Sequence, residues 1–361
     1  MRLFQDFLDQ SKQLNQAQAP LELQYHPPKD KYKIVHQKLI IADLPAPLHY
    51  LNFFSFIGQP NSAVFCNSSE ISTTALDTAT VLVSSSPHMV GQMNSYSIKD
   101  DCRLSNDDNN NVIFEFGQKE KLAGKLPYFE IQRLDDELSF DLKIQTVPLV
   151  SYYSYLKFGF AEHWSLVAQC EGTIQYKDQK YQIQQVGAFE YLRMVNFPYL
   201  PHALHVYQLV QLSENLQMIC IHSRDQMNNI LYSRIYLRDI SNNQMRQFDR
   251  NIYFNIYRLF PKVTTANHQE MYLPREFGWQ YQDKNFQITI EAQSRGDYKF
   301  GLAAGYVGSF SYQIQINEDI YQGESGYLEY IDCRPLRWQE IDKENKALKK
   351  VTNPALIMLK K

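Results

Sequence analysis

The stretch Gly187-Ala188-Phe189-Glu190-Tyr191 returns in altered form as Gly326-Tyr327-Leu328-Glu329-Tyr330. Each copy follows the same order: an alternating strand, a polar turn, and a second segment that runs through the glycine into the Glu-Tyr strand. The correspondence extends upstream, where Ile174 matches Ile314, so the offset stays near 140 residues. This period is too long for a solenoid repeat and suits a whole small domain. The sequence therefore predicts two related domains in tandem, with two unrelated hairpins as the alternative.

The composition of the chain favours a β protein. With 361 residues, of which 44% are hydrophobic and 21% charged, the chain can form two domains with their own cores. Aromatic residues make up 14% of the chain, with 25 Tyr and 21 Phe, and they suit the half-buried surface of a sheet. The net charge of −3 and the lack of a dense basic block predict no nucleic-acid partner, which would need clustered Lys and Arg.

The cysteines and the N-terminus bear on the cellular compartment. The cysteines are widely separated, odd in number and without a C-x-x-C pair: Cys66, Cys102, Cys170, Cys220 and Cys333. We interpret them as free thiols in a reducing compartment. Residues 1–19 carry Gln, Asp and Lys among apolar residues, unlike a signal peptide. No later run approaches the ~20 apolar residues of a membrane-spanning helix. The sequence predicts a soluble, cytoplasmic protein without an integral membrane segment.

Alternation of apolar and polar residues predicts short strands along most of the chain. The exception is the N-terminus, where helical spacing predicts one amphipathic helix over residues 2–16 that docks on the body. Strand patterns follow at 80–83, 112–116, 138–144, 168–176, 206–212, 216–222, 277–281 and 286–290. Short polar loops join several of them as hairpins, which favours sandwiches or barrels. After Pro335 the tail is rich in Lys and Glu and is expected to form a helix with a loose end.

Five features around the repeated strand carry a resemblance to known proteins. They are Glu171-Gly172 before a turn, Tyr181, the Gly187–Tyr191 strand, the Tyr207–Asp225 hairpin and the Gly323–Tyr330 stretch. Together they resemble the AttH and carotenoid 1,2-hydratase (hydroxyneurosporene synthase) superfamily, and they are similar to uncharacterised bacterial members with a Gly-x-Phe-Glu-Tyr strand. The resemblance covers roughly residues 165–335, while residues 31–160 fit it only in strand style.

The resemblance implies an all-β fold of two tandem lipocalin-like (calycin) antiparallel β-barrels with short N- and C-terminal helical extensions. We expect an N-terminal helix and linker over residues 1–30, a first barrel over 31–195, a second barrel over 196–335 and a charged tail over 336–361. A ligand or active site is implied where the strand after the glycine meets the barrels. In the hydratase members this strand carries an aromatic residue and then an Asp that acts as an acid toward a polyene double bond.

The chain departs from that pattern after Phe189, because Glu190, Tyr191, Leu192 and Arg193 follow and no Asp does. This departure weakens the case for hydration. Glu190 is the candidate acid, since a hydrophobic pocket raises the pKa of a Glu, and Tyr191 would orient the substrate. In a strand, however, Phe189 and Tyr191 share one face and Glu190 lies on the other. The alternative is a structural ion pair between Glu190 and Arg193, or an Arg on a neighbouring strand.

Residues near this strand are expected to line the ligand site. The expected ligand-binding set is Phe189, Arg193, His202, His205, Tyr207 and Trp164. In an extended segment His202 and His205 point to opposite faces, which is poor geometry for a shared metal ion. Each histidine has a hydrogen-bonded structural role as its alternative. With no H-E-x-x-H, P-loop or G-x-S-x-G motif, the sequence predicts no metal and no cofactor.

These features predict that the protein binds an extended hydrophobic small molecule, of fatty-acyl, isoprenoid or polyene type, in or between two barrels. One alternative is a cofactor-free hydratase, cyclase or isomerase that acts on such a molecule by acid catalysis. The second is a structural scaffold with filled barrels. Aromatic richness fits a ligand cavity and a filled core equally well.

Overall fold

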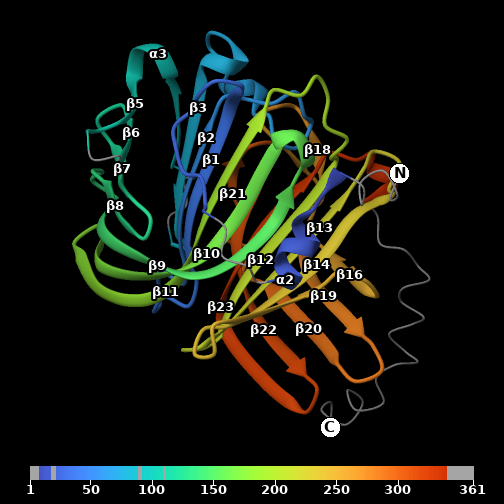
Figure 1. Ribbon diagram of the computed structural model, residues 1–361. Helices are drawn as coiled ribbons and strands as arrows, with labels where there is room; N and C mark the ends of the chain where they lie inside the picture. The colour runs from blue at the N-terminus through green and yellow to red at the C-terminus, as the bar shows by residue number, and fades with distance from the viewer. Residues whose placement is uncertain (1–7, 18–21, 88–91, 109–110, 340–361) are drawn as a thin grey trace.

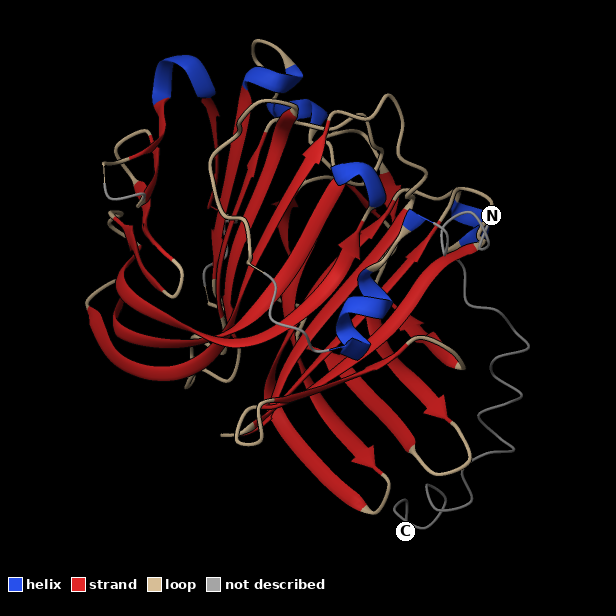
Figure 2. Ribbon diagram, in the orientation of Figure 1, coloured by secondary structure: helices blue, strands red, loops and turns tan. Residues whose placement is uncertain are grey.

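The computed structural model describes residues 8–17, 22–87, 92–108 and 111–339, which form a mostly β architecture with a few short helices (Figures 1 and 2). Two large antiparallel sheets dominate it. Within the described residues the first sheet has eleven strands and the second has ten. The first sheet curls into a near-closed barrel, and the second curls into a half-barrel. The predicted all-β class is confirmed.

The first sheet contains strands β1 to β11. Their bounds are β1 (Tyr32–Ile41), β2 (Leu51–Ile57), β3 (Thr78–Ser84), β4 (Gln92–Ser97), β5 (Cys102–Asn106), β6 (Val112–Phe116), β7 (Glu120–Lys125), β8 (Tyr128–Arg133), β9 (Leu138–Tyr155), β10 (Ala161–Tyr176) and β11 (Gln179–Val195). Their spatial order is β4-β3-β2-β1-β11-β10-β9-β8-β7-β6-β5. The first and last strands are therefore neighbours inside the sheet, and the two edge strands, β4 and β5, follow one another in the chain.

The second sheet repeats this arrangement. Its strands are β12 (Leu204–Ser213), β13 (Leu216–Arg224), β14 (Ile230–Asp239), β15 (Gln244–Phe248), β16 (Ile252–Leu259), β19 (Pro274–Gln282), β20 (Gln287–Ser294), β21 (Lys299–Leu302), β22 (Gly305–Ile316) and β23 (Asp319–Asp332). Their order is β15-β14-β13-β12-β23-β22-β20-β19-β16, with β21 beside β22. Again the first and last strands are neighbours, and the edge strands β15 and β16 are consecutive. The short strands β17 (Val263–Thr264) and β18 (Glu270–Met271) pair separately.

The repeated motif occupies the same place in both sheets. In β11, Glu190 lies opposite Lys38 of β1. In β23, Glu329 lies opposite Tyr207 of β12. Each glutamate is thus on the last strand of its sheet and faces the first strand, as a tandem pair of related sheets requires.

Close contact between strands explains the glycine of each motif. A Cβ atom on Gly187 would lie 2.4 Å from the carbonyl oxygen of Ile40, and one on Gly326 would lie 2.5 Å from the ring of Phe310. No larger residue fits at either place without a shift of its neighbours. Glycine is therefore the residue that lets the strands bend and approach here.

Strand alternation sends the motif residues into different cores. Phe189 and Tyr191 belong to the apolar cluster inside the first barrel, whereas Ala188 belongs to a cluster shared by both sheets. A third cluster fills the half-barrel. The predicted opposition of Glu190 to its aromatic neighbours is confirmed, and its face of β11 is covered by the second sheet.

The N-terminal helix connects the two sheets. It is α2 (Ser11–Ala17), shorter than the predicted helix over 2–16, of which residues 1–7 lie outside the described residues. The Asn15 amide donates to the carbonyl oxygen of Tyr152 in β9 at 2.8 Å and to the side-chain oxygen of Gln247 in β15 at 2.6 Å. The helix therefore docks on the body, as predicted.

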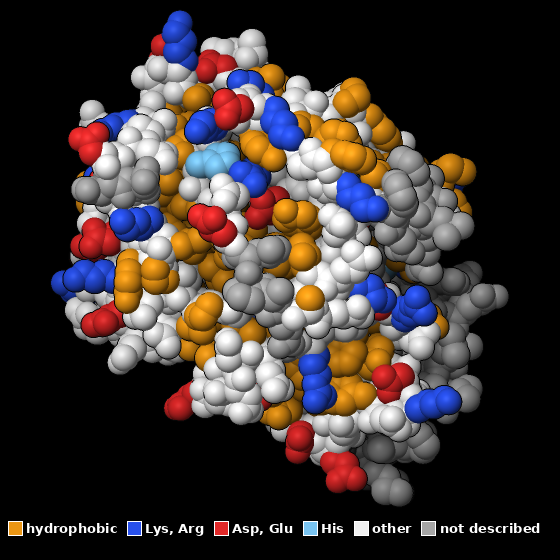
Figure 3. All heavy atoms as spheres, viewed as in Figure 1, with side chains coloured by type: hydrophobic (Ala, Val, Ile, Leu, Met, Phe, Trp, Pro, Cys, Tyr) orange, Lys and Arg blue, Asp and Glu red, His pale blue; other side chains and the backbone are white. Residues whose placement is uncertain are grey.

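At the C-terminus a short 3-10 turn, Leu336–Trp338, follows β23. The rest of the predicted tail helix lies outside the described residues. Another short helix, α3 (Ile98–Asp101), joins β4 to β5. Among the described residues, no helix has the length and apolar character needed to span a membrane. On the face seen in Figure 3, apolar side chains gather beside Lys and Arg side chains over the upper end of the molecule.

Candidate functional site

A cavity of about 410 Å³ lies between the two sheets. Apolar side chains from both sheets form most of its wall, among them Phe54, Phe56, Phe65, Leu192, Ile221 and Leu302. Its volume falls in the range of small-molecule sites, roughly 300–1,000 Å³. Leu8 and Asp9, just before α2, border it as well. The cavity thus lies where the two sheets and the N-terminal segment meet.

Three buried charges meet beside this cavity. The ammonium nitrogen of Lys38 lies 2.8 Å from Glu190 Oε2 and 2.9 Å from Glu329 Oε1. None of the three side chains is more than 3% exposed. Lys38 and Glu190 belong to the first sheet and Glu329 to the second, so the ion cluster bridges the interface. Two carboxylates against one ammonium group leave one net negative charge.

Tyrosine hydroxyl groups satisfy further oxygen positions of the two carboxylates. Tyr153 and Tyr207 donate to Glu190 Oε1 at 2.9 and 2.5 Å. Tyr327 donates to Glu329 Oε1 at 3.0 Å. Lys38 also lies 3.9 Å from the centroid of the Tyr207 ring, within the range of a cation–π contact. Buried charges persist only when paired and hydrogen-bonded, and this cluster meets both conditions.

The charges of this cluster stabilise one another. Burial alone would raise the pKa of Glu190, but Lys38 and His163 hold it well below its ordinary value. Burial likewise opposes the lowered pKa of Glu329, which Lys38 again brings about. Burial would lower the pKa of Lys38, and the two carboxylates raise it instead. Glu190 is therefore ionised at neutral pH, contrary to the raised pKa that a purely apolar pocket would give.

Imidazole rings line the cavity next to the ion cluster. His163 Nε2 lies 3.8 Å from Glu190 Oε2, and His205 Nε2 lies 3.9 Å from Glu329 Oε2. The ring of His36 meets that of His163 edge-on, with centroids 5.6 Å apart. Burial lowers the pKa of His163, and burial followed by the Lys38 charge lowers that of His36 much further. Both rings are neutral at neutral pH.

Two of these histidines hold equivalent positions in the sheets. His36 lies opposite the residue two positions after Glu190, and His205 lies opposite the residue two positions after Glu329. Each sheet therefore presents a carboxylate and a histidine to the shared cavity from the same pair of strands.

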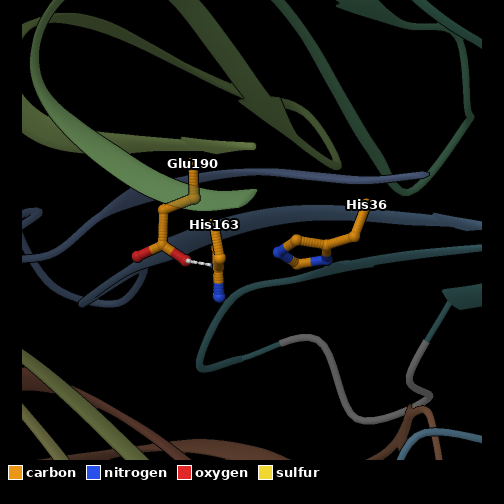
Figure 4. A group of neighbouring side chains, drawn as sticks. All are labelled: His36, His163 and Glu190. Atoms are coloured by element: carbon orange, nitrogen blue, oxygen red, sulfur yellow. Dashed lines mark ion pairs between the residues drawn. The ribbon is translucent and has the colours of Figure 1, made fainter. Parts of the chain in front are cut away.

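Figure 4 shows His36 and His163 turned toward Glu190, a group whose ligand atoms all lie within 4.8 Å of one another. Ligands of a tetrahedral zinc ion stand roughly 3.3–3.5 Å apart, given bonds of about 2.0–2.2 Å. The 3.8 Å between His163 and Glu190 exceeds this spacing. The Lys38 ammonium group already occupies Glu190 and would repel a second cation. The residues present do not fit a metal ion without rearrangement.

Some sequence-predicted site residues lie away from this cavity. Phe189 stacks on Phe129 inside the first barrel, with ring centroids 4.6 Å apart. Tyr191 and Trp164 belong to the same barrel core, and the Tyr191 hydroxyl donates to the carbonyl oxygen of His26 at 2.8 Å. They face the opposite side of the sheet from the cavity because strand residues alternate.

The expected Arg partner of Glu190 is wrong, since Lys38 takes that place. Arg193 instead donates to Glu162 Oε2 at 2.7 Å and lies 2.7 Å from the His26 ring. An odd number of positions separates Arg193 from Glu190 in the strand, so their side chains leave opposite faces.

Three of the predicted residues do line the cavity: His202, His205 and Tyr207. The expectation that the two histidines point to opposite faces is wrong. His202 precedes β12 and is not in a strand, so period-two alternation does not apply to it. Both rings lie 5.4 Å from the ring of Phe65, measured between centroids.

Sequence reasoning missed Lys38 and His36, which both lie in β1. This strand is buried on both faces from Ile34 to Ile41, so it lacks the alternation that marks a half-buried strand. The available signal was the pair of polar residues inside an apolar run, because a buried Lys needs a partner.

A larger hollow, of about 860 Å³, lies along the first sheet. It is open, and exposed polar side chains line much of it, including Lys121, Glu130, Lys143, Gln145 and Gln169. It lacks the enclosed apolar wall of the interface cavity, which we therefore take as the candidate site.

Comparison with solved structures extends over most of the chain. A putative AttH protein from Nitrosomonas europaea aligns with a TM-score of 0.59 and 12% identity, covering 87% of this chain and 98% of that chain. Kievitone hydratase from Nectria haematococca aligns with a TM-score of 0.52 and 12% identity, covering 85% and 90%. These likenesses establish a shared fold and confirm the predicted AttH-like architecture.

No curated protein sequence shows a significant match to the chain. A family model matches residues 54–345 and so includes strands of both sheets and the two glutamates that share Lys38. The chain therefore belongs to the family described as a family of unknown function (DUF6670).

Proposed function

We propose that the protein binds an extended, uncharged hydrophobic molecule in the cavity between its two sheets. The observation that carries the proposal is an apolar cavity of about 410 Å³ whose charged neighbours already have partners. Burial of apolar ligand surface supplies affinity, at about 25 cal/mol per Å². Fatty-acyl esters, isoprenoid alcohols and polyenes have the required chemistry.

The charges around the cavity favour a neutral ligand. Lys38 is held between two carboxylates, and Arg234 is 2.9 Å from Asp9. A ligand carboxylate would enter next to a cluster with a net negative charge and lose its hydration without gaining a free cation. A hydroxyl or carbonyl group meets neutral imidazoles instead. His36 Nδ1 is buried and has no hydrogen-bond partner.

A second candidate is a cofactor-free isomerase or hydratase. The two histidine–carboxylate pairs, His163 with Glu190 and His205 with Glu329, favour it because a neutral imidazole beside a carboxylate can act as a general base. Glu190 itself is too acidic to serve as the proton donor. Deuterium from D₂O should enter the carbon skeleton of a bound substrate, and His163→Gln should abolish this incorporation. Absence of deuterium in the recovered molecule would remove the candidate.

The binding proposal is tested with all-trans-retinol, an uncharged isoprenoid alcohol, added to the full-length protein. We expect saturable binding, followed by retinol fluorescence. Ala161→Phe places a ring at the cavity wall and should weaken binding at least about ten-fold, as expected when a close-packed site is filled. Saturable binding that Ala161→Phe leaves unchanged would contradict the proposal.

A matched variant controls for the substitution itself. Ala123→Phe adds the same ring in the polar hollow on the first sheet, where Ala123 is half-buried. It should leave retinol affinity unchanged. If Ala123→Phe abolished binding and Ala161→Phe did not, the ligand site would be the hollow and the interface proposal would fail.

A further inference from the structure

An aromatic rim surrounds one end of the interface cavity. It is formed by the loop 156–161 between β9 and β10 and the loop 196–203 between β11 and β12. Phe158, Phe160 and Tyr199 on these loops are 72%, 37% and 59% exposed. The ring of Phe160 contacts those of Phe158 and Phe197, each with centroids 5.8 Å apart. Several large rings thus meet solvent together, where single exposed ones would need no explanation.

The rim is continuous with the cavity wall. Leu156 and Ala161, at the two ends of the first loop, line the cavity, and so do Phe197 and Tyr199 of the second. Tyr199 is both exposed and part of the wall, so the cavity reaches solvent among these rings.

The backbone at Phe158 points in the same direction. Its φ of 62° and ψ of 14° fall in the left-handed region, which bulky residues rarely adopt. Packing does not offset this strain, because the ring is mostly exposed. Strain kept at an exposed aromatic residue is a mark of a functional position.

Lysine side chains flank the rim. Lys31 donates to the carbonyl oxygen of Phe158 at 3.0 Å, Lys29 is exposed two residues earlier, and Lys157 directly precedes Phe158. Asp30 is the acidic residue within this group, which leaves a net positive charge. Figure 3 shows apolar side chains beside Lys and Arg side chains at this end of the molecule.

We propose that this rim docks on an anionic membrane surface, so that the hydrophobic ligand passes between the bilayer and the cavity. The inference rests on the proposed function, because an apolar ligand resides in membranes and would otherwise have to cross water. Exposed aromatic rings insert at the headgroup level, and neighbouring lysines are attracted to anionic lipids. The charge and the continuity with the cavity favour a lipid surface over a protein partner.

The test is sedimentation of the full-length protein with phosphatidylcholine–phosphatidylserine vesicles. The wild type should sediment with them, and much less with phosphatidylcholine alone. The double variant Phe158→Asn/Phe160→Ser should lose at least about ten-fold in partitioning. Neither residue lines the cavity, and Asn tolerates the left-handed backbone, so the variant should keep its fold. Lys29→Gln/Lys31→Gln should weaken sedimentation with the anionic vesicles selectively.

Tyr253→Ser is the control, because Tyr253 is 60% exposed on β16 and does not line the cavity. It should sediment like the wild type. A wild type that stays in solution with anionic vesicles, or an equal loss in Tyr253→Ser, would overturn the docking proposal.

Retinol uptake from solution separates the two proposals. The Phe158→Asn/Phe160→Ser variant should still take up retinol without vesicles. Retinol uptake without vesicle binding by the wild type would refute docking alone, whereas vesicle binding without retinol uptake would refute the ligand proposal.

Discussion

Glu190 and Glu329 hold the same position in the two sheets and share one cation, the ammonium group of Lys38. Because Lys38 lies in the first sheet and Glu329 in the second, the shared cation joins the sheets at the edge of the cavity. Stability of the interface and the polarity of the candidate site therefore depend on the same side chains.

Removal of the shared cation should destabilise the protein strongly. Lys38→Met leaves two buried carboxylates without their partner, and such a loss typically costs about 3–5 kcal/mol. Chemical denaturation should show a decrease of this size in the free energy of unfolding. Glu190→Gln should also destabilise, because it removes one of the two carboxylates that stabilise Lys38.

A triple variant separates charge from packing in that experiment. Lys38→Met with Glu190→Gln and Glu329→Gln removes all three charges and should recover much of the lost stability, since uncharged replacements of buried ion clusters are often well tolerated. If the triple variant were as unstable as Lys38→Met, the loss would come from packing and the electrostatic account would be wrong.

Stability should fall as the pH is lowered below about 6.5. Burial lowers the pKa of His36 and of His163, and it lowers that of His202 to about 3. The unfolded chain therefore binds protons that the folded chain does not, and each such histidine contributes up to about 1.4 kcal/mol per pH unit. The pKa values of Glu190 and Glu329 are also lowered, so their stabilisation is present above the unfolded pKa and is lost at still lower pH.

The histidine contribution can be isolated by substitution. His36→Phe keeps an aromatic ring next to Phe54 and Phe56, and it removes one group that titrates on unfolding. The slope of unfolding free energy against pH, measured by denaturation from pH 7 to pH 5, should become shallower by about one proton. An unchanged slope would show that His36 is protonated in the folded protein.

Gly187→Ala should destabilise the fold by about 1–3 kcal/mol, because the new methyl group would lie 2.4 Å from the Ile40 carbonyl oxygen in the neighbouring strand. Gly308→Ala is the comparison, since its nearest neighbour is a side-chain oxygen of Asp297 at 3.1 Å, which can move aside. Thermal denaturation should rank Gly187→Ala well below Gly308→Ala. Equal melting temperatures would contradict the proposed role of close strand approach.

Ligand charge should control affinity. Retinoic acid has the same skeleton as retinol but carries a carboxylate, which would meet the net negative charge of Lys38, Glu190 and Glu329. At pH 8 retinol should bind at least about ten-fold more tightly, a difference of about 1.4 kcal/mol. Tighter binding of retinoic acid would mean that a cation is available in the cavity.

Local patterns in the sequence predicted much of the fold. Residues 138–144 alternate because one face of β9 packs inside the barrel and the other meets solvent. The repeated motif predicted correctly that Glu190 lies opposite its aromatic neighbours and that Glu329 is its counterpart. Both results follow from period two and from the constant offset of the repeat.

The site itself could be predicted only in part. Lys38 pairs with Glu329, which is 291 residues away, and no local pattern encodes such a contact. Sequence reasoning also placed the ligand on the side of Phe189 and Tyr191, because barrel interiors are the usual place for one. In this chain those rings fill the first barrel, and the cavity lies on the other face of β11.

Native mass spectrometry of the full-length protein purified from cells tests the central claim most directly. The account predicts that the wild type carries an uncharged hydrophobic molecule, seen as added mass that is released on denaturation, and that Ala161→Phe lacks it while Ala123→Phe retains it. A ligand-free wild type that also fails to take up retinol, or an adduct that persists in Ala161→Phe, would contradict binding between the sheets.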